Sequence, residues 1–274
     1  MTRIWLCADD YGISPSVNAA IRDLLVRGRI NATSVMVVAP SLHHAEALAL
    51  QTLNTTGRRV AIGLHVTLSA PFRPLSDGFR PLRNGAFPAL PALLMRACLR
   101  SLEPDALIAE IARQLRVFVE HFGRTPDFID GHQHVQALPI VRDAVLAFAR
   151  RRDVPIRTVE LPVAIDRSAL PAQFKAMLLS EMGRRLSTAA DGFALNHGFL
   201  GVRSFHEKEP YRTLFRRWLS LASPDSLIMC HPGIPDETLA MRDSVTTARA
   251  EEFQYLSGPG YLADRAERLA KHKI

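Results

Sequence analysis

The stretch IWLCADDYGISPSVNAAIRDLLVRG, residues 4–28, contains the first strand, loop and helix of the chain and sets the pattern that follows. Its apolar run at 4–8 predicts a buried strand, which the polar loop from Asp9 to Gly12 ends. Ser14 is placed to cap a helix that has Pro15 in its first turn, and Gly28 is placed to end it. We therefore expect a buried strand followed by a helix that packs on the sheet.

The same alternation continues along the chain. We predict further strands at 32–39, 60–66, 128–131, 157–161, 194–199 and 226–230, and helices at 41–53, 104–122, 139–152, 168–190, 211–221 and 245–256. Repeated β-α units with apolar strands are typical of a parallel sheet covered by helices. With about seven strands, we predict an α/β fold of the TIM-barrel-like (β/α) type, incomplete or distorted. Because no G-x-G-x-x-G motif follows the first strand, an open dinucleotide-binding sheet is not indicated.

One segment interrupts this alternation. Residues 69–103 hold prolines at 71, 74, 81, 88 and 91, together with glycines at 78 and 85. A long irregular excursion inside a compact domain is usually a lid or a binding loop. We therefore predict a single domain over residues 1–274, with a Pro-rich lid or insertion at about 69–103.

The composition excludes several classes of protein. Of the 274 residues, 47% are hydrophobic and 22% are charged, which excludes a disordered chain. The three cysteines lack C-x-x-C spacing, so neither a disulfide framework nor a cysteine zinc site is indicated. The net charge of +7 comes from scattered arginines, so we expect no nucleic-acid partner. Because no apolar run reaches about 18 residues and no apolar leader is visible, we expect no membrane partner and a cytoplasmic location.

Polar side chains cluster at the ends of four predicted strands. They are Asp9 and Asp10 after the first strand, His65 near the end of 60–66, Asp130, His132 and His134 at the end of 128–131, and His231 after 226–230. In (β/α) barrels the carboxyl ends of the strands surround the active site. We therefore expect these side chains to face one mouth of the barrel.

Asp10, His65 and His132 are the candidate metal ligands. Two histidines and one carboxylate from different elements suit a divalent metal ion with open positions for water. Adjacent residues of an extended segment point in opposite directions, so one of the two aspartates can bind the ion while the other accepts a proton. His231 is placed to protonate a leaving group, and His134 is placed to support the ligands or to contact the substrate.

Several blocks of the sequence resemble the YdjC-like carbohydrate deacetylases of the ChbG type. These blocks are ADDYG at 8–12, NATSVMV at 31–37, IGLH at 62–65, PDFIDGHQHV at 126–135 and MCHP at 229–232. The resemblance implies a TIM-barrel-like fold related to the NodB-type polysaccharide deacetylases. It also implies a magnesium or zinc ion held by Asp10, His65 and His132, with Asp9 as the base and His231 as the acid.

The resemblance further implies the reaction and its partners. We expect a metal-dependent hydrolase of a carbon–nitrogen bond that removes the N-acetyl group of an amino sugar or a chitooligosaccharide-like substrate, and a homodimer. Tyr11 and Phe72 are the best-placed rings to stack on such a sugar, and Asp130 and His134 are further candidates for contact with the substrate or the ligands.

The chain departs from the family pattern at Gln136, where the family usually reads H-x-H-V-H, and Tyr11 replaces a commoner Phe. Residues 164–210 match little of the family. We expect Arg249, Glu251 and Glu252, on the predicted helix at 245–256, to form surface ion pairs.

Three other interpretations of the same residues remain open. One is another metal-dependent hydrolase on this scaffold, acting on a different amide or an ester. A second is a non-catalytic protein that binds sugar or nucleic acid, which predicts salt-dependent binding and no role for Asp9. A third is an iron oxygenase, because two histidines and one carboxylate also suit that metal.

Overall fold

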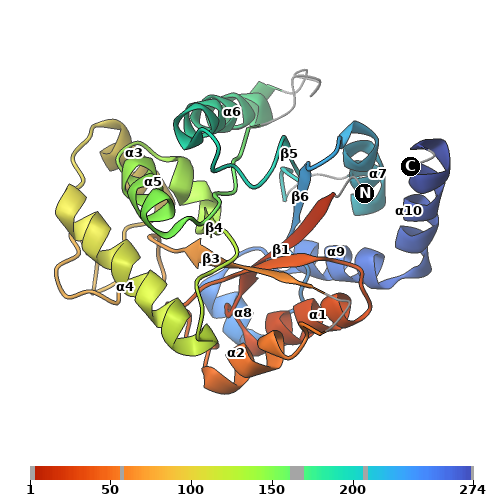
Figure 1. Cartoon of the computed structure of the whole chain (residues 1–274), viewed down its shortest axis with the longest axis horizontal. Coiled ribbons are helices and arrows are strands. Elements are labelled where there is room, and N and C mark those ends of the chain that lie inside the picture. The colour runs from red at the N-terminus through yellow and green to blue at the C-terminus, as the bar shows by residue number, and fades with distance from the viewer. Residues whose placement is uncertain (1–3, 56–58, 161–169, 206–208, 273–274) are drawn as a thin grey trace.

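Six parallel strands form one curled sheet in the computed structural model, which describes residues 4–55, 59–160, 170–205 and 209–272. The strands are β1 (Trp5–Tyr11), β2 (Ala32–Val35), β3 (Ala61–Val66), β4 (Ile129–Gly131), β5 (Phe199–Leu200) and β6 (Leu227–Cys230). Their order across the sheet is β4-β3-β2-β1-β6-β5 (Figure 1). The strands therefore follow their chain order around the sheet from β1 to β4, and β6 returns to pair with β1, as in a (β/α) barrel.

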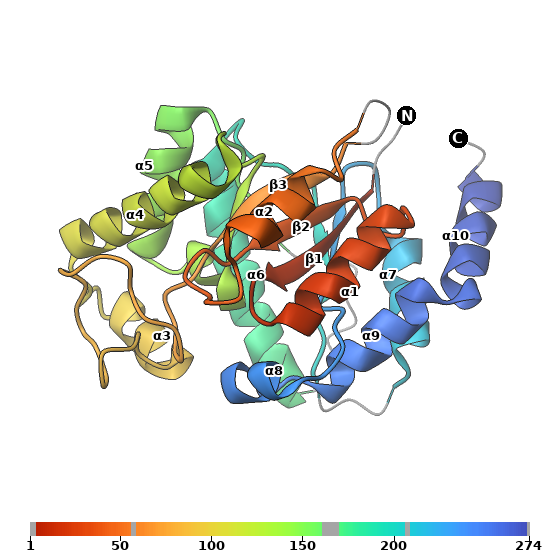
Figure 2. The ribbon, with the colours of Figure 1, turned by 90° about the horizontal axis from the view of Figure 1, so that it is seen from below.

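Helices cover the outer face of this sheet (Figures 1 and 2). The helices of the described residues are α1 (Pro15–Val26), α2 (His44–Gln51), α3 (Leu90–Cys98), α4 (Pro104–Phe122), α5 (Val141–Arg152), α6 (Leu170–Ala190), α7 (Tyr211–Leu221), α8 (Glu237–Arg242), α9 (Thr247–Ser257) and α10 (Pro259–His272), of which α3 lies in the Pro-rich segment and α10 packs on α7 and α9. A 3-10 helix, η1 (His132–Ala137), follows β4 directly. Among the described residues, no helix combines the length and the apolar character that crossing a membrane requires.

The expected strands at 157–161 and 194–199 are only partly present. Ile156 forms single parallel bridges to Ile129 and to Ala194, and of the expected second strand only Phe199 belongs to β5. Residue 161 lies outside the described residues. The sequence-based prediction of two regular strands there is therefore wrong, because too few consecutive residues pair on either side.

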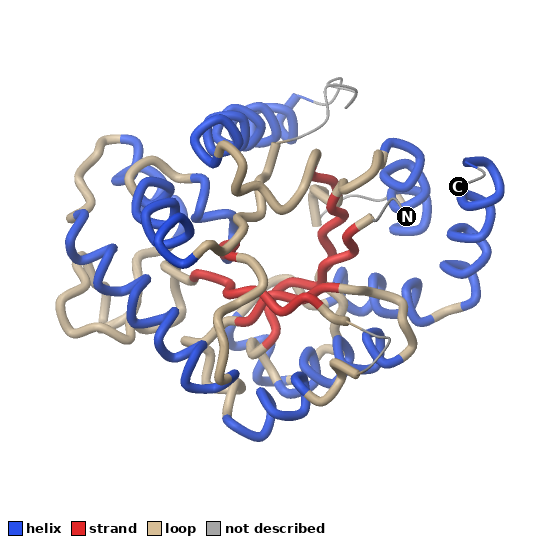
Figure 3. The backbone as a smooth tube through the Cα atoms, in the orientation of Figure 1, coloured by secondary structure: helices blue, strands red, loops and turns tan. Residues whose placement is uncertain are grey.

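Hydrogen bonds of this irregular segment nevertheless join the two edges of the sheet. Arg157 N–H donates to the carbonyl of Ile129 in β4 at 2.9 Å, and Phe199 N–H in β5 donates to the carbonyl of Glu160 at 2.9 Å. Figure 3 shows the strands curving around, with loops completing the ring. The predicted TIM-barrel-like fold is confirmed in its distorted form, with an irregular segment between β4 and β5.

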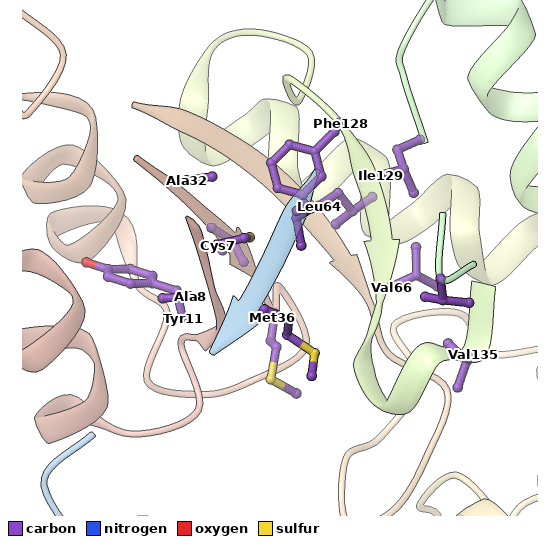
Figure 4. Close-up of a cluster of buried hydrophobic side chains, with 14 of the residues drawn as sticks. Cys7, Ala8, Tyr11, Ala32, Met36, Leu64, Val66, Phe128, Ile129 and Val135 are labelled. Carbon is purple, nitrogen blue, oxygen red and sulfur yellow. The ribbon is translucent and has the colours of Figure 1, made fainter. Parts of the chain in front are cut away.

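Local sequence signals produce the elements that carry the site. The Ser14 hydroxyl accepts a hydrogen bond from the N–H of Val17 at 3.2 Å and so caps α1, as expected. In β3, a Cβ on Gly63 would lie 2.4 Å from the ring of Phe128, so only glycine lets β3 and the segment at Phe128 pack this closely. Figure 4 shows Phe128, Leu64 and Cys7 among the buried side chains of this sheet.

The Pro-rich segment is held to α4 by buried polar contacts. It contains the helix α3 and a small core of its own, in which the rings of Phe79 and Phe87 meet edge to face at 4.9 Å. The Glu110 side chain of α4 is fully buried and accepts hydrogen bonds from the N–H groups of Leu75 at 3.1 Å and Ser76 at 2.8 Å. Buried polar groups need such partners, so Glu110 fixes this part of the segment against the barrel.

We predict that Glu110→Ala lowers the free energy of unfolding by about 2–4 kcal/mol, because it removes the buried acceptor of the N–H groups of Leu75 and Ser76 and of the Gln114 amide. Urea denaturation followed by circular dichroism measures this change. The matched control is Glu120→Ala on the same helix, whose side chain is exposed in an ion pair with Arg113 and should contribute less than about 1 kcal/mol. Equal effects of the two substitutions would contradict this role of Glu110.

Candidate active site

Three side chains from separate strand ends converge on one point. His65 Nε2 lies 3.2 Å and His132 Nδ1 lies 2.8 Å from the same oxygen of Asp10, Oδ1. All three residues are buried, and their ligand atoms lie within 4.8 Å of one another. Neutral imidazole nitrogens and a carboxylate oxygen all offer lone pairs, so this donor set fits a divalent metal ion. The structure thus brings together the three predicted ligands.

Asp130 and Ser34 orient the ring of His65. Its Nδ1 lies 2.7 Å from Asp130 Oδ1 and 2.9 Å from the hydroxyl of Ser34, which leaves Nε2 to face Asp10. A carboxylate behind a histidine is the usual support of a metal-binding imidazole. Burial lowers the pKa of His65, but Asp130 and Asp10 raise it to about 10. The carboxylates therefore favour a positive charge at this position.

Asp9 binds an arginine that the sequence analysis did not identify. Arg157 donates from Nη1 to Asp9 Oδ1 at 2.5 Å and from Nη2 to Asp9 Oδ2 at 2.8 Å. The same guanidinium lies 2.8 Å from Asp130, and all three residues are fully buried. Burial raises the pKa of Asp9, but Arg157 and the nearby histidines His65 and His231 lower it to about 2. Asp9 is therefore held in its ionised form.

A second group of potential ligands lies beside the first. Cys7, Asp9 and Asp130 also have ligand atoms within 4.8 Å of one another. The Arg157 guanidinium contacts all three, with Nη1 3.9 Å from the sulfur of Cys7. Because a cation already binds these groups, we assign them to Arg157 and not to a metal ion.

The backbone at Asp10 lets two adjacent aspartates reach different partners. Asp10 has a φ of +68°, and the pairing of β1 with β2 shifts register between Ala8 and Tyr11. A non-glycine residue in this region is strained, and such strain is common at functional sites. The expected separation of the two aspartates is present, but it comes from this irregularity at the end of β1.

Three further candidates border the cluster. The ring of Phe72 meets that of His132 edge to face at 6.0 Å, although Phe72 is only 4% exposed. The ring of His134 meets Phe199 at 5.4 Å, and burial lowers the pKa of His134 to about 3. The N–H of His231 donates to Glu252 at 2.5 Å, and its half-buried side chain faces the ring of Phe205 at 5.6 Å.

Tyr11 does not belong to this cluster. Its ring is completely buried, and its hydroxyl donates to a carboxyl oxygen of Glu46 at 2.7 Å and accepts from Arg22 at 3.0 Å. Figure 4 shows the ring pointing toward the helices. A ring without exposed surface is unable to stack on a sugar, so the structure contradicts that prediction.

The expectation of surface ion pairs on the last predicted helix is wrong for Arg249 and Glu252. Arg249 is 1% and Glu252 is 2% exposed, and Arg249 contacts Asp10. Both share the inner face of α9 with the buried Leu256, at a spacing of three and four residues. This spacing is the sequence signal that could have placed Arg249 and Glu252 on the buried face of the helix. It is a weak signal, because charged residues on a helix are exposed far more often than buried.

Gln136, the departure from the family pattern, also lies close by. It is fully buried in η1, and its amide Nε2 donates to the main-chain carbonyl of Arg157 at 3.3 Å. Gln136 therefore supports the segment that carries Arg157.

Comparisons with known proteins agree with this architecture. Chitooligosaccharide deacetylases from Yersinia pestis (strain Pestoides F) and Yersinia pseudotuberculosis serotype O:1b (strain IP 31758) are each 29% identical over 267 residues, covering 96% of this chain and 94% of the relative. A crystal structure from Enterococcus faecalis V583, of a protein described as a candidate for cellobiose-phosphate cleavage, superposes with a TM-score of 0.71. That structure is 19% identical and covers 97% of this chain and 94% of its own, so it supports the fold alone.

The family assignment rests on a match that spans almost the whole chain. The sequence model described as YdjC-like protein matches residues 3–267, from the first strand to the last helix. The resemblance inferred from the sequence blocks is thereby confirmed: the chain belongs to the YdjC-like protein family.

Proposed function

We propose that this protein is a metal-dependent carbohydrate deacetylase that hydrolyses the N-acetyl group of an amino sugar or chitooligosaccharide to acetate and a free amine. The observation that carries the proposal is the convergence of His65 Nε2 and His132 Nδ1 on Asp10 Oδ1, with Asp9 next to Asp10 in the chain. The substrate class is supported by the relatives, which are named chitooligosaccharide deacetylases and match this chain over 94% of their length.

Asp10, His65 and His132 would hold the ion. Bound there, a divalent metal ion would lower the pKa of a water molecule and polarise the acyl carbonyl. Imidazole nitrogens suit zinc, whereas magnesium prefers oxygen ligands. Of the two ions that the family resemblance implies, the donor set therefore favours zinc.

Asp9 and His231 would carry the proton transfers. Arg157 and Asp130 fix the Asp9 carboxylate in one orientation, where it accepts a proton from the attacking water. His231 belongs to a separate strand end and donates a proton to the nitrogen as the C–N bond breaks. Phe72 packs on His132 and His134 packs on Phe199 at the border of the cluster, and these two rings are the remaining candidates for contact with the sugar. We include a homodimer in this proposal, on the family resemblance alone, and keep the cytoplasmic location expected in the sequence analysis.

Metal removal tests the reaction class. We expect the purified protein to release acetate from N-acetylated chitooligosaccharides, to lose this activity after dialysis against a chelator, and to regain it with a single added metal. Acetate is measured by a coupled assay across a panel of sugars, with zinc and magnesium restored separately. Tightly bound metal with no acetate from any sugar would point instead to another hydrolase substrate.

The proposed base should behave differently from the proposed metal ligands. Because Asp9 would act as the base, we expect Asp9→Asn to lower kcat by at least about 100-fold while the bound metal is retained. His65→Ala should lose the metal as well as the activity. Metal content is measured by mass spectrometry alongside acetate release, with the surface variant Asp23→Asn as the control. Asp9→Asn with wild-type activity would refute the base assignment.

The leaving group tests His231. An amine needs a proton to depart, whereas an activated phenolate does not. We therefore expect His231→Ala to lower kcat for an N-acetylated sugar by about 100-fold or more, but to change hydrolysis of an activated phenyl acetate much less. Rates on both substrates give the comparison. An equal loss on the two would show that His231 is not the proton donor.

A further inference from the structure

Arg249 of α9 is a buried arginine that joins Asp10 to Asp243. Its Nη2 lies 2.5 Å from Asp10 Oδ2 and 2.5 Å from Asp243 Oδ2. Its Nε donates to the main-chain carbonyl of Val245 at 3.0 Å, and its side chain is 2% exposed. Transferring a guanidinium from water to this position is costly unless it is paired, and the two carboxylates supply that pairing.

The contact divides the two oxygens of Asp10 between different partners. Oδ1 faces His65 and His132, whereas Oδ2 faces Arg249. With Oδ2 bound in this way, Asp10 presents one oxygen to the position between the histidines. A hydrogen bond to a ligating carboxylate fixes its orientation, and loss of such a partner usually weakens metal binding.

Two features indicate that this contact serves the site more than the stability of the fold. Arg249 Nη1 is buried and has no hydrogen-bond partner within the described residues. The position that lets Nη2 pair with Asp10 therefore leaves another donor of the same guanidinium unsatisfied, which is destabilising. Asp10 itself has the strained φ of +68°, which surrounding contacts must maintain. Arg249 supplies such a contact from a helix about 240 residues further along the chain.

We propose that Arg249 is a positioning residue that holds Asp10 as a one-oxygen ligand of the metal ion. Arg249 thereby couples the metal centre to α9. The inference rests on the metal site of the proposed function, but it requires neither the sugar substrate nor the release of acetate.

Arg203 provides a matched control. Its side chain is 3% exposed and pairs with Glu251 and Glu252 of the same helix, at 3.1 Å in each case. It is thus a second buried arginine that pairs with α9, and within the described residues its ion pairs are with Glu251 and Glu252 and not with Asp10. Replacing it should disturb the packing of α9 without changing the orientation of Asp10.

The experiment is a zinc titration of the metal-free protein by calorimetry, with circular dichroism and a melting curve for each variant. We expect Arg249→Gln to weaken zinc binding by about 10–100-fold. Arg249→Lys keeps the charge but lacks the planar fork, so we expect an intermediate affinity. Arg203→Gln should lower the melting temperature and leave the zinc affinity within about 2-fold of the wild type, since its ion pairs are with Glu251 and Glu252 and not with Asp10.

A folded Arg249→Gln protein that binds zinc as the wild type does would overturn the inference. If Arg249→Gln does not fold, the zinc affinity of Arg249→Lys is the test. An affinity equal to that of the wild type in Arg249→Lys would overturn the inference in the same way. The absorption spectrum of the cobalt-loaded protein is a second readout: it should change in Arg249→Gln, where Asp10 is free to bind through both oxygens, and remain unchanged in Arg203→Gln.

The outcomes separate this inference from the proposed function. Weaker zinc binding in the Arg249 variants, together with no acetate release by the wild type, would support the positioning role and refute the deacetylase. Acetate release that depends on zinc, with wild-type affinity in the variants, would refute the positioning role alone. A wild-type protein that binds no divalent ion would refute both.

Discussion

The balance of buried charge is the constraint on which the site depends. Asp9, Asp10 and Asp130 are each almost completely buried. Isolated carboxylates at such positions would be strongly destabilising, so each must face a positive charge or a hydrogen-bond donor. Arg157 forms ion pairs with Asp9 and Asp130, and Arg249 forms one with Asp10. The oxygen of Asp10 that remains faces two histidines, and the carboxylates of Asp130 and Asp10 raise the pKa of His65 despite its burial.

This constraint explains why the barrel must close. Asp9 and Asp10 lie at the end of β1, whereas Arg157 lies in the irregular segment between β4 and β5, and Arg249 lies on α9. The hydrogen bonds that join 155–160 to β4 and to β5 bring Arg157 beneath the mouth. A regular strand is not needed at that position. The segment needs to hold one guanidinium in place, and Gln136 supports its main chain.

The same arrangement gives two neighbouring aspartates different chemistry. Both oxygens of Asp9 bind Arg157, which lowers the pKa of the carboxyl and fixes its direction. The oxygens of Asp10 are shared between a guanidinium and two imidazoles. Environment, and not residue type, therefore separates the two carboxyl groups, and the proposed roles of base and metal ligand rest on this difference. The wall formed by Phe72 is held beside these groups by a segment that Glu110 anchors to α4.

The sequence by itself determined the alternation of strands and helices, the barrel type and the strand ends at which the candidate ligands lie. These features are local, because burial periodicity, capping residues and the position of a polar residue after an apolar run are all encoded in short segments. For that reason Asp10, His65 and His132 could be identified as candidates from the sequence alone. Only the tertiary structure decided that Tyr11 turns away from the site and that Arg157 and Arg249 enter it. A buried, paired arginine and an exposed one occupy the same kinds of position in a sequence, and the difference depends on which distant carboxylates the fold brings within hydrogen-bond distance.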